Sequence, residues 1–191
     1  MEVAIYHSVL GVRPGLIDVA ARFNAAGHRV ELVDQYDGRT FDSYDEASAF
    51  VEGIGFPALL ASALDGVAHL DDGFVAAGFS NGAGMAEYVA TQRSVSGVVL
   101  LSGAIPLNVL GVESWPAGVP AQIHATTRDP FRNQEWVDVL VSSIQETSKV
   151  EVFDYDGDGH LFTDPSLPME YEPENAEKLW GRVIEFCNRH G

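Results

Sequence analysis

Short apolar runs alternate with amphipathic helical patterns along the whole chain, and this alternation restricts the possible folds more than any other feature. Six apolar runs have the length of buried strands, at residues 2–7, 29–34, 73–80, 95–103, 119–127 and 149–155. Apolar residues at helical spacing predict helices within the segments 15–28, 43–50, 57–70, 82–92, 133–147 and 173–189. Strands that are apolar throughout are typical of a parallel sheet. The chain is therefore expected to form an α/β fold of about six mostly parallel strands with helices on both faces.

The alternation continues without a linker, a repeat or a low-complexity tract, so residues 1–191 are expected to form a single domain. Cys187 is the only cysteine, which leaves no partner for a disulfide within the chain. The first residues, MEVAIYHSVLG, lack the basic start of a signal peptide, and no apolar run is long enough to span a bilayer. These features predict a cytoplasmic protein without a membrane partner.

The charge of the chain is strongly acidic, with 28 Asp and Glu residues against 11 Lys and Arg residues and a formal net charge of −17. Such a surface repels phosphate backbones and anionic membranes at long range. Nucleic acid is therefore not expected as a partner, and the charge is most simply explained by solubility.

The segment GFSNGAG, residues 78–84, carries the pattern Gly-x-Ser-x-Gly at the point where an apolar strand turns into a helix. A nucleophile elbow has this context, because its turn leaves no room for Cβ atoms two residues before and after the serine. Ser80 is therefore predicted to be a nucleophile with a strained backbone and an exposed hydroxyl. The amide of Asn81, at the helix N-terminus, is predicted to donate to an oxyanion. The alternative is a glycine-rich turn that only packs tightly.

A serine hydroxyl needs a neighbouring base, and the base needs an acid that orients it. Asp129 follows the strand at 119–127, and His160 follows the strand at 149–155. Hydrolases with a nucleophile elbow carry these groups in the chain order serine, acid, histidine. Ser80, Asp129 and His160 are therefore the predicted catalytic residues.

The segment VFDYDGDGHLFTD, residues 152–164, also resembles the start of an EF-hand calcium loop. Carboxylates alternate there and are followed by glycine, at Asp154, Asp156, Asp158 and Gly159. Position 12 of such a loop supplies a bidentate carboxylate, but Pro165 stands there, and a strand rather than a helix precedes the loop. Calcium is therefore disfavoured, and neither a metal nor an organic cofactor is expected. The aspartates are rival triad acids, although they lie close to His160 in sequence and are expected to form a solvated loop that holds it.

With these residues in hand, the chain resembles the dienelactone hydrolase family of the α/β-hydrolase superfamily over nearly its full length. The resemblance rests on the segments HSVLGVRPGLIDVAARFNAAGHRVELVD, VAAGFSNGAGMA, TTRDPF and GDGHLFTDP. It implies an α/β-hydrolase-like three-layer sandwich without a large cap domain. It also implies that Val9, in the segment HSVLG, donates a second backbone amide to the oxyanion hole.

The chain departs from the namesake enzymes of that family at three positions. Ser80 stands where they have a cysteine nucleophile, and Ser8 stands where they have a glutamate that handles the resting thiol. Asp164 stands where they have an arginine that holds the carboxylate of the substrate. An acidic residue would repel that carboxylate, so the resemblance implies the general chemistry of the family and not its namesake substrate.

The sequence thus predicts a serine hydrolase that acts on small carboxylic esters, lactones or thioesters through a Ser-His-Asp triad and an acyl-enzyme. The alternative is a catalytically silent binding protein with the same fold. Candidate substrate-binding residues, for each of which ordinary packing is the alternative, are Tyr36, Trp115, Phe131, Phe162 and Asp164. No feature of the sequence specifies an oligomeric state.

Overall fold

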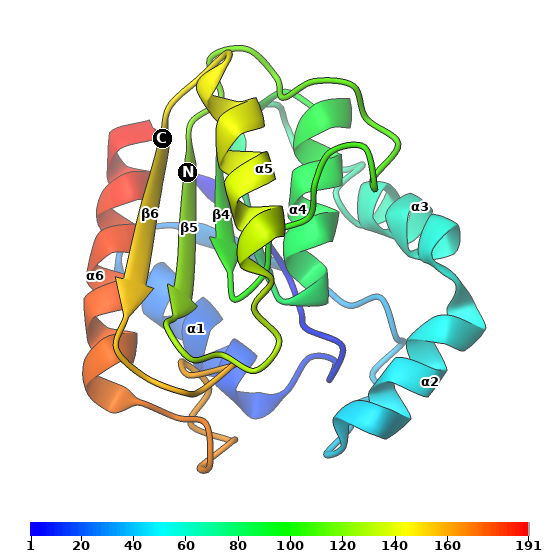
Figure 1. The fold of residues 1–191 in the computed structure, drawn as a ribbon, viewed down its shortest axis with the longest axis vertical. Coiled ribbons are helices and arrows are strands. Elements are labelled where there is room, and N and C mark those ends of the chain that lie inside the picture. Colours follow the sequence, from blue (N-terminus) through cyan, green and yellow to red (C-terminus); the bar gives the residue numbers. More distant parts are fainter. Residues whose placement is uncertain (191) are drawn as a thin grey trace.

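The chain forms one six-stranded sheet in the computed structural model, which describes residues 1–190 (Figure 1). The strands stand in the order β2-β1-β3-β4-β5-β6, and every pairing is parallel. Their bounds are β1 Glu2–Tyr6, β2 Arg29–Val33, β3 Phe74–Phe79, β4 Val95–Leu101, β5 Ala121–Thr126 and β6 Val150–Tyr155. Each strand lies inside the apolar run that predicted it, so the predicted sheet is confirmed.

Residues 1–190 form six helices, which are α1 Pro14–Ala25, α2 Tyr44–Ile54, α3 Phe56–Gly66, α4 Asn81–Gln92, α5 Gln134–Gln145 and α6 Pro173–His190. Two of them begin at side-chain caps, because Ser43 accepts a hydrogen bond from the Glu46 amide and Asn133 accepts one from the Trp136 amide. The break between α2 and α3 falls at Gly55, whose φ of 85° ends a helical run. Residue 53, expected between these two helices, is instead inside α2.

Alternate residues of the strands point to opposite faces and build two apolar layers. Ala4, Tyr6, Ala76 and Leu100 face the layer covered by α3, α4 and α5. Val3, Ile5, Ala77 and Leu101 face the layer covered by α1 and α6. Figure 1 shows α6 on one side of the strands and α4 and α5 on the other. The three-layer sandwich is therefore confirmed, and the carboxyl ends of all six strands meet at one edge.

Helices α2 and α3 are the most apolar consecutive pair. Within residues 1–190, no single helix is long and apolar enough to cross a membrane. These two reach the required length only when they are counted together across a bend of 87°.

Two glycines allow α4 to approach the sheet closely. A Cβ atom on Gly78 would overlap the carbonyl of Gly82, and a Cβ atom on Gly82 would overlap the carbonyl oxygens of Tyr6 and His7. These obstacles are backbone atoms, which cannot swing aside as a flexible side chain can. By contrast, Gly181 lies within α6 with open space around it.

We expect Gly78→Ala to lower the free energy of unfolding by about 1–3 kcal/mol, because the added methyl group forces the backbone of β3 and α4 apart. The matched control is Gly181→Ala, which should raise it by about 0.5–1 kcal/mol because alanine has the lower conformational entropy in a helix. Urea denaturation measures both. A Gly78→Ala protein as stable as wild type would contradict the close packing described here.

His124 is a fully buried ionisable residue in β5. Its Nε2–H donates to Gln122 Oε1 at 3.1 Å, and the Tyr155 hydroxyl donates to its Nδ1 at 2.9 Å. Burial, with a smaller contribution from the positive charge of Arg182, lowers the pKa of His124 from 6.5 to about 3. The imidazole is therefore neutral in the folded protein at neutral pH.

This burial predicts a specific loss of stability in acid. Below pH 6.5 the unfolded chain binds a proton at His124 and the folded chain does not until about pH 3, so stability falls as the pH falls through this window. The difference in unfolding free energy between wild type and His124→Gln should therefore shift by roughly 2 kcal/mol from pH 7 to pH 5. The control is His69→Gln, because the His69 side chain is 61% exposed. A pH-independent difference for His124→Gln would show that this histidine titrates normally.

Candidate active site

Ser80 stands on a sharp turn between β3 and α4. Its backbone has φ 52° and ψ −114°, a region that residues other than glycine rarely adopt. The turn is held because the Ser80 amide donates to the Leu101 carbonyl at 2.7 Å and the Ala83 amide donates to the Ser80 carbonyl at 2.9 Å. The predicted strand-turn-helix context and strained backbone of Ser80 are therefore present.

A chain of hydrogen bonds connects Ser80, His160 and Asp129, although 80 residues separate the first two in sequence. The distance from Ser80 Oγ to His160 Nε2 is 2.7 Å, and the distance from His160 Nδ1 to Asp129 Oδ2 is also 2.7 Å. A carboxylate only accepts hydrogen bonds, so Nδ1 carries the proton and Nε2 is free to accept from the serine hydroxyl. The structure thus brings together all three residues predicted as nucleophile, base and acid.

Two hydrogen bonds hold the Asp129 carboxylate, one from a nearby backbone amide and one from His160. The Phe131 amide donates to Asp129 Oδ1 at 2.8 Å, which leaves Oδ2 for the imidazole. The Asp129 side chain is 1% exposed and the His160 side chain 4%. Because water has little access to this pair, its hydrogen bond is not weakened by competition with solvent.

The loop that carries His160 has no regular structure and is held by polar contacts. Ser102 Oγ donates to the His160 carbonyl at 2.5 Å, and Thr126 Oγ1 donates to the Gly159 carbonyl at 2.8 Å. On the other side, Glu170 accepts from the Leu161 amide at 2.7 Å and Glu172 accepts from the Gly159 amide at 2.9 Å. These side chains were not predicted. The position of Ser102 and Thr126 at the carboxyl ends of β4 and β5 was the one available signal.

The aspartates that precede His160 are paired with arginines. Asp154 Oδ1 forms an ion pair with Arg132 Nη1 at 2.8 Å. Asp156 and Asp158 both form ion pairs with Arg128, the residue next to Asp129. These pairs join the end of β6 and the loop after it to the loop after β5. Within residues 1–190, no group of three or more acidic, histidine or cysteine side chains is arranged to hold a metal ion. Within the described part of the chain, the acid bound to the His160 imidazole is Asp129, and the three rival acids are bound to arginines.

The two amides proposed for an oxyanion hole lie at the start of α4 and in the turn after β1. Among the loop, turn and side-chain hydrogen bonds of residues 1–190, none uses the amide of Asn81 or of Val9. The carbonyl of His7 and the first turn of α4 are in close contact, as the space around Gly82 shows. Both amides thus belong to segments that meet beside Ser80.

A pocket of about 320 Å³ opens beside Ser80 and His160. Its size falls at the lower end of the range for small-molecule sites. Its other lining residues are Asn81, Ser102, Gly103, Ala104, Ile105, Ile123, Ala125, Asp129, Phe131, Arg132, Asn133, Trp136 and Val137. Phe131 was predicted as a wall residue and is in this set, with its ring centroid 4.7 Å from that of His160. The apolar side chains of Ile105 and Trp136 were not predicted, because both lie outside the recognised motifs.

Glu87 in α4 binds the backbone of Ile105, one of the residues that line the pocket. It is fully buried in α4, and its Oε1 accepts from the Ile105 amide at 2.9 Å. Burial raises the pKa of Glu87 well above its usual value. Its hydrogen bond to the Ile105 amide holds the segment that carries Ile105 against α4.

Three other candidate substrate-binding residues lie outside the pocket. Trp115 is 1% exposed and donates to the Val119 carbonyl at 2.7 Å. Phe162 is also 1% exposed and packs against Tyr155 in the layer under α1 and α6. Tyr36 is buried beneath the loop after β1, with its ring edge against His7. The expectation that these three line the pocket is therefore corrected: burial of their large apolar surfaces places them in the core.

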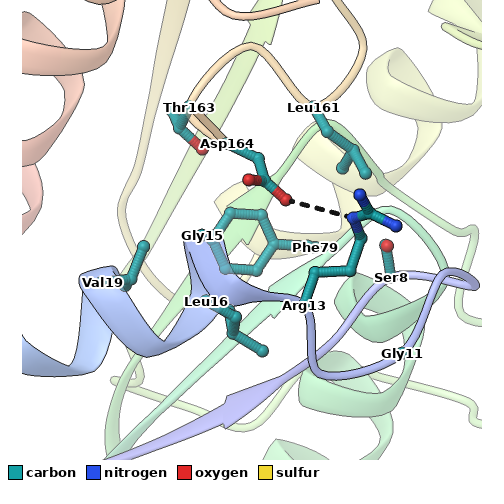
Figure 2. A pocket seen from close by; sticks show the side chains of 10 residues that line it. All are labelled: Ser8, Gly11, Arg13, Gly15, Leu16, Val19, Phe79, Leu161, Thr163 and Asp164. Atoms are coloured by element: carbon teal, nitrogen blue, oxygen red, sulfur yellow. Dashed lines mark ion pairs between the residues drawn. The ribbon is translucent and has the colours of Figure 1, made fainter. Parts of the chain in front are cut away.

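Asp164 also lies away from the pocket that contains Ser80. Figure 2 shows it facing Arg13 across a small, separate pocket beside Phe79. The distance from Asp164 Oδ2 to Arg13 Nε is 3.9 Å. A side chain at Gly15 would overlap the carboxylate, so Asp164 sits at the first turn of α1, where the helix dipole favours an anion. The expected role of Asp164 in contact with substrate is therefore corrected, because its charge is directed to a cation and a helix end.

The sheet order, the two helical layers and the serine on the turn after β3 define an α/β hydrolase. The model of the dienelactone hydrolase family matches residues 2–191. The chain belongs to the dienelactone hydrolase family and is a hydrolase.

Solved structures of low sequence identity share this fold. A dienelactone hydrolase-like promiscuous phosphotriesterase from metagenomic libraries has a TM-score of 0.84 and 16% identity, over 99% of this chain and 86% of its own. Alpha/beta hydrolase domain-containing protein 10 from mouse has a TM-score of 0.72 and 11% identity, over 100% and 90%. A metagenome-derived lipolytic enzyme has a TM-score of 0.66 and 14% identity, over 99% and 94%. No curated protein sequence matches the chain.

Proposed function

We propose that this protein is a serine hydrolase that cleaves small, uncharged carboxylic esters through an acyl-enzyme. The observation that carries the proposal is the pair of 2.7 Å contacts that connect Ser80 to His160 and His160 to Asp129. In this arrangement the imidazole can take the serine proton, and the carboxylate stabilises the imidazolium that results.

The reaction has two halves. Ser80 Oγ attacks the ester carbonyl carbon while its proton moves to His160 Nε2, and the amides of Asn81 and Val9 stabilise the oxyanion. The bond from carbon to the alcohol oxygen then breaks, and the leaving alcohol takes the proton from His160. Water repeats the sequence on the acyl-enzyme, which releases the acid and restores Ser80.

The charges around the pocket support an uncharged substrate. Besides His160, the acidic and basic side chains among its lining residues are Asp129, which binds His160, and Arg132. The Arg132 side chain is 12% exposed and binds Asp154 at 2.8 Å, so its charge is already compensated. Ile105, Ile123, Val137 and Trp136 offer apolar surface for an acyl or alcohol group.

Ser80→Ala should abolish both hydrolysis of p-nitrophenyl butyrate and covalent labelling by a neutral fluorophosphonate, because the attacking oxygen is removed. Mass mapping of the wild-type adduct should locate it on Ser80. The control is Ser142→Ala, since the Ser142 hydroxyl lies on the exposed side of α5 and donates to the Asp138 carbonyl. An adduct on another serine, or hydrolysis that survives Ser80→Ala, would contradict Ser80 as the nucleophile. A wild-type protein that neither hydrolyses the ester nor is labelled would instead favour a silent binding protein.

Asp129→Asn should lower kcat on the order of 10⁴-fold, because an amide favours the tautomer of His160 that cannot accept the serine proton. Asp158→Asn is the matched control. Asp158 lies in the loop that carries His160, but its carboxylate binds Arg128 and not the imidazole. The kcat of this variant should stay within about threefold of wild type, as expected for loss of a solvated ion pair. If Asp129→Asn kept most of its activity and Asp158→Asn lost it, the acid would be wrongly assigned.

A further inference from the structure

The peptide group between Ser8 and Val9 is held at its carbonyl end by two donors. The Gly11 amide donates to the Ser8 carbonyl at 3.1 Å and closes a tight turn over residues 8–11. His7 Nδ1 lies 2.6 Å from the same carbonyl oxygen. In a trans peptide the N–H points opposite to the C=O. A peptide whose carbonyl is held by His7 and Gly11 therefore directs the Val9 N–H away from both.

The neighbours of His7 determine which of its nitrogens carries the proton. The Gln35 amide donates to Nε2 at 3.0 Å, so Nε2 is the acceptor and Nδ1 carries the hydrogen that binds the Ser8 carbonyl. The His7 side chain is 0% exposed, and burial lowers its pKa even though Asp34 lies 3.9 Å away. The Tyr36 ring packs edge-on against the imidazole, with 4.4 Å between the ring centroids, and restricts rotation of the His7 side chain.

The same segment presses directly on the turn that carries the nucleophile. A Cβ atom at Gly82 would overlap the carbonyl oxygens of Tyr6 and His7, so the backbone after β1 and the start of α4 are in contact. The Val9 amide follows two residues later and makes no hydrogen bond within the loops, turns and side chains of residues 1–190. Among those residues it is an unpaired donor, two residues after the carbonyl that contacts Gly82 in the first turn of α4.

We infer that His7 is a positioning residue: by donating from Nδ1 to the Ser8 carbonyl, it orients the Ser8–Val9 peptide so that the Val9 N–H points at the oxyanion. This inference rests on the proposed function, because it concerns the second donor of that oxyanion hole. Tyr36 and Gln35 act through His7, since they hold the ring plane and the tautomer. The sharp turn alone, with one bond from Gly11, leaves the peptide plane free to tilt.

Two substitutions separate the two nitrogens of His7. In His7→Asn the amide nitrogen stands near the position of Nδ1, so the donor to the Ser8 carbonyl is kept and the acceptor for Gln35 is lost. In His7→Gln the carbonyl oxygen stands near the position of Nε2, so the acceptor is kept and the donor is lost. Both variants lose the ring and its packing on Tyr36, so each is the structural control of the other.

We expect His7→Gln to lower kcat for p-nitrophenyl butyrate by about 100-fold, the effect of removing one oxyanion donor, with KM within about threefold. His7→Asn should keep kcat within about tenfold of wild type, with a urea midpoint similar to that of His7→Gln. The rate of Ser80 phosphonylation should follow kcat, because the phosphonyl oxygen occupies the same hole. Equal losses of kcat in the two variants would overturn the inference.

A measurement on the wild-type protein guards against variants that do not fold. In ¹⁵N-labelled protein the His7 ring should be neutral with its proton on Nδ1, and phosphonylation of Ser80 should shift the Val9 amide proton downfield. A proton on Nε2, or a Val9 amide unaffected by the adduct, would overturn the inference while leaving the esterase proposal intact. A wild-type protein that neither hydrolyses the ester nor labels at Ser80 would overturn the proposed function, and this inference with it.

Discussion

The turn at Ser80 is the constraint on which the rest of the site depends. Its positive φ is unfavourable for a serine, so the surrounding structure must hold it in place. Hydrogen bonds from the Ser80 amide to β4 and from the Ala83 amide to the Ser80 carbonyl provide part of that support. Close backbone contact between β3, β1 and the first turn of α4, which requires Gly78 and Gly82, provides the rest. The hydroxyl is thereby presented at the carboxyl edge of the sheet, where His160 from the loop after β6 contacts it.

The other two residues of the candidate triad, His160 and Asp129, lie on irregular segments that polar contacts hold in place. His160 depends on hydroxyl groups from the ends of β4 and β5 and on two glutamates near α6. Ser102 also has a positive φ, of 54°, at the end of the strand next to β3. Backbone strain thus occurs at the ends of two adjacent strands, one followed by Ser80 and the other by Ser102, which holds the His160 loop. Unfavourable conformations are commonly retained where they serve a site.

The acidic side chains around the site are paired with specific neighbours. Although the chain carries a formal net charge of −17, the four aspartates between β6 and α6 or within β6 are each paired with an arginine. Asp154 is bound to Arg132, Asp156 and Asp158 to Arg128, and Asp164 to Arg13. Asp129 alone is directed to the imidazole, from a position that water hardly reaches. A strongly acidic surface is therefore compatible with a pocket that presents apolar walls and compensated charges.

The sequence by itself determined the strands, their parallel arrangement and the chain positions of Ser80, Asp129 and His160, because these follow from local pattern. A buried parallel strand must be apolar throughout, and a tight elbow must carry glycine at both flanks, so both are visible within a few residues. Tertiary structure alone decided the contents of the pocket and the supports of the histidine loop. Trp115, Phe162 and Asp164 are of residue types that often bind substrates. Trp115 and Phe162 nevertheless lie in the core, and Asp164 faces Arg13 and the first turn of α1. Ser102 and Glu170 hold the His160 loop through contacts with residues 58 and 9 positions away, and the role that we infer for His7 depends on the orientation of one peptide plane. Such contacts leave no periodic signal in the chain, since they depend on which loops the completed sheet brings together.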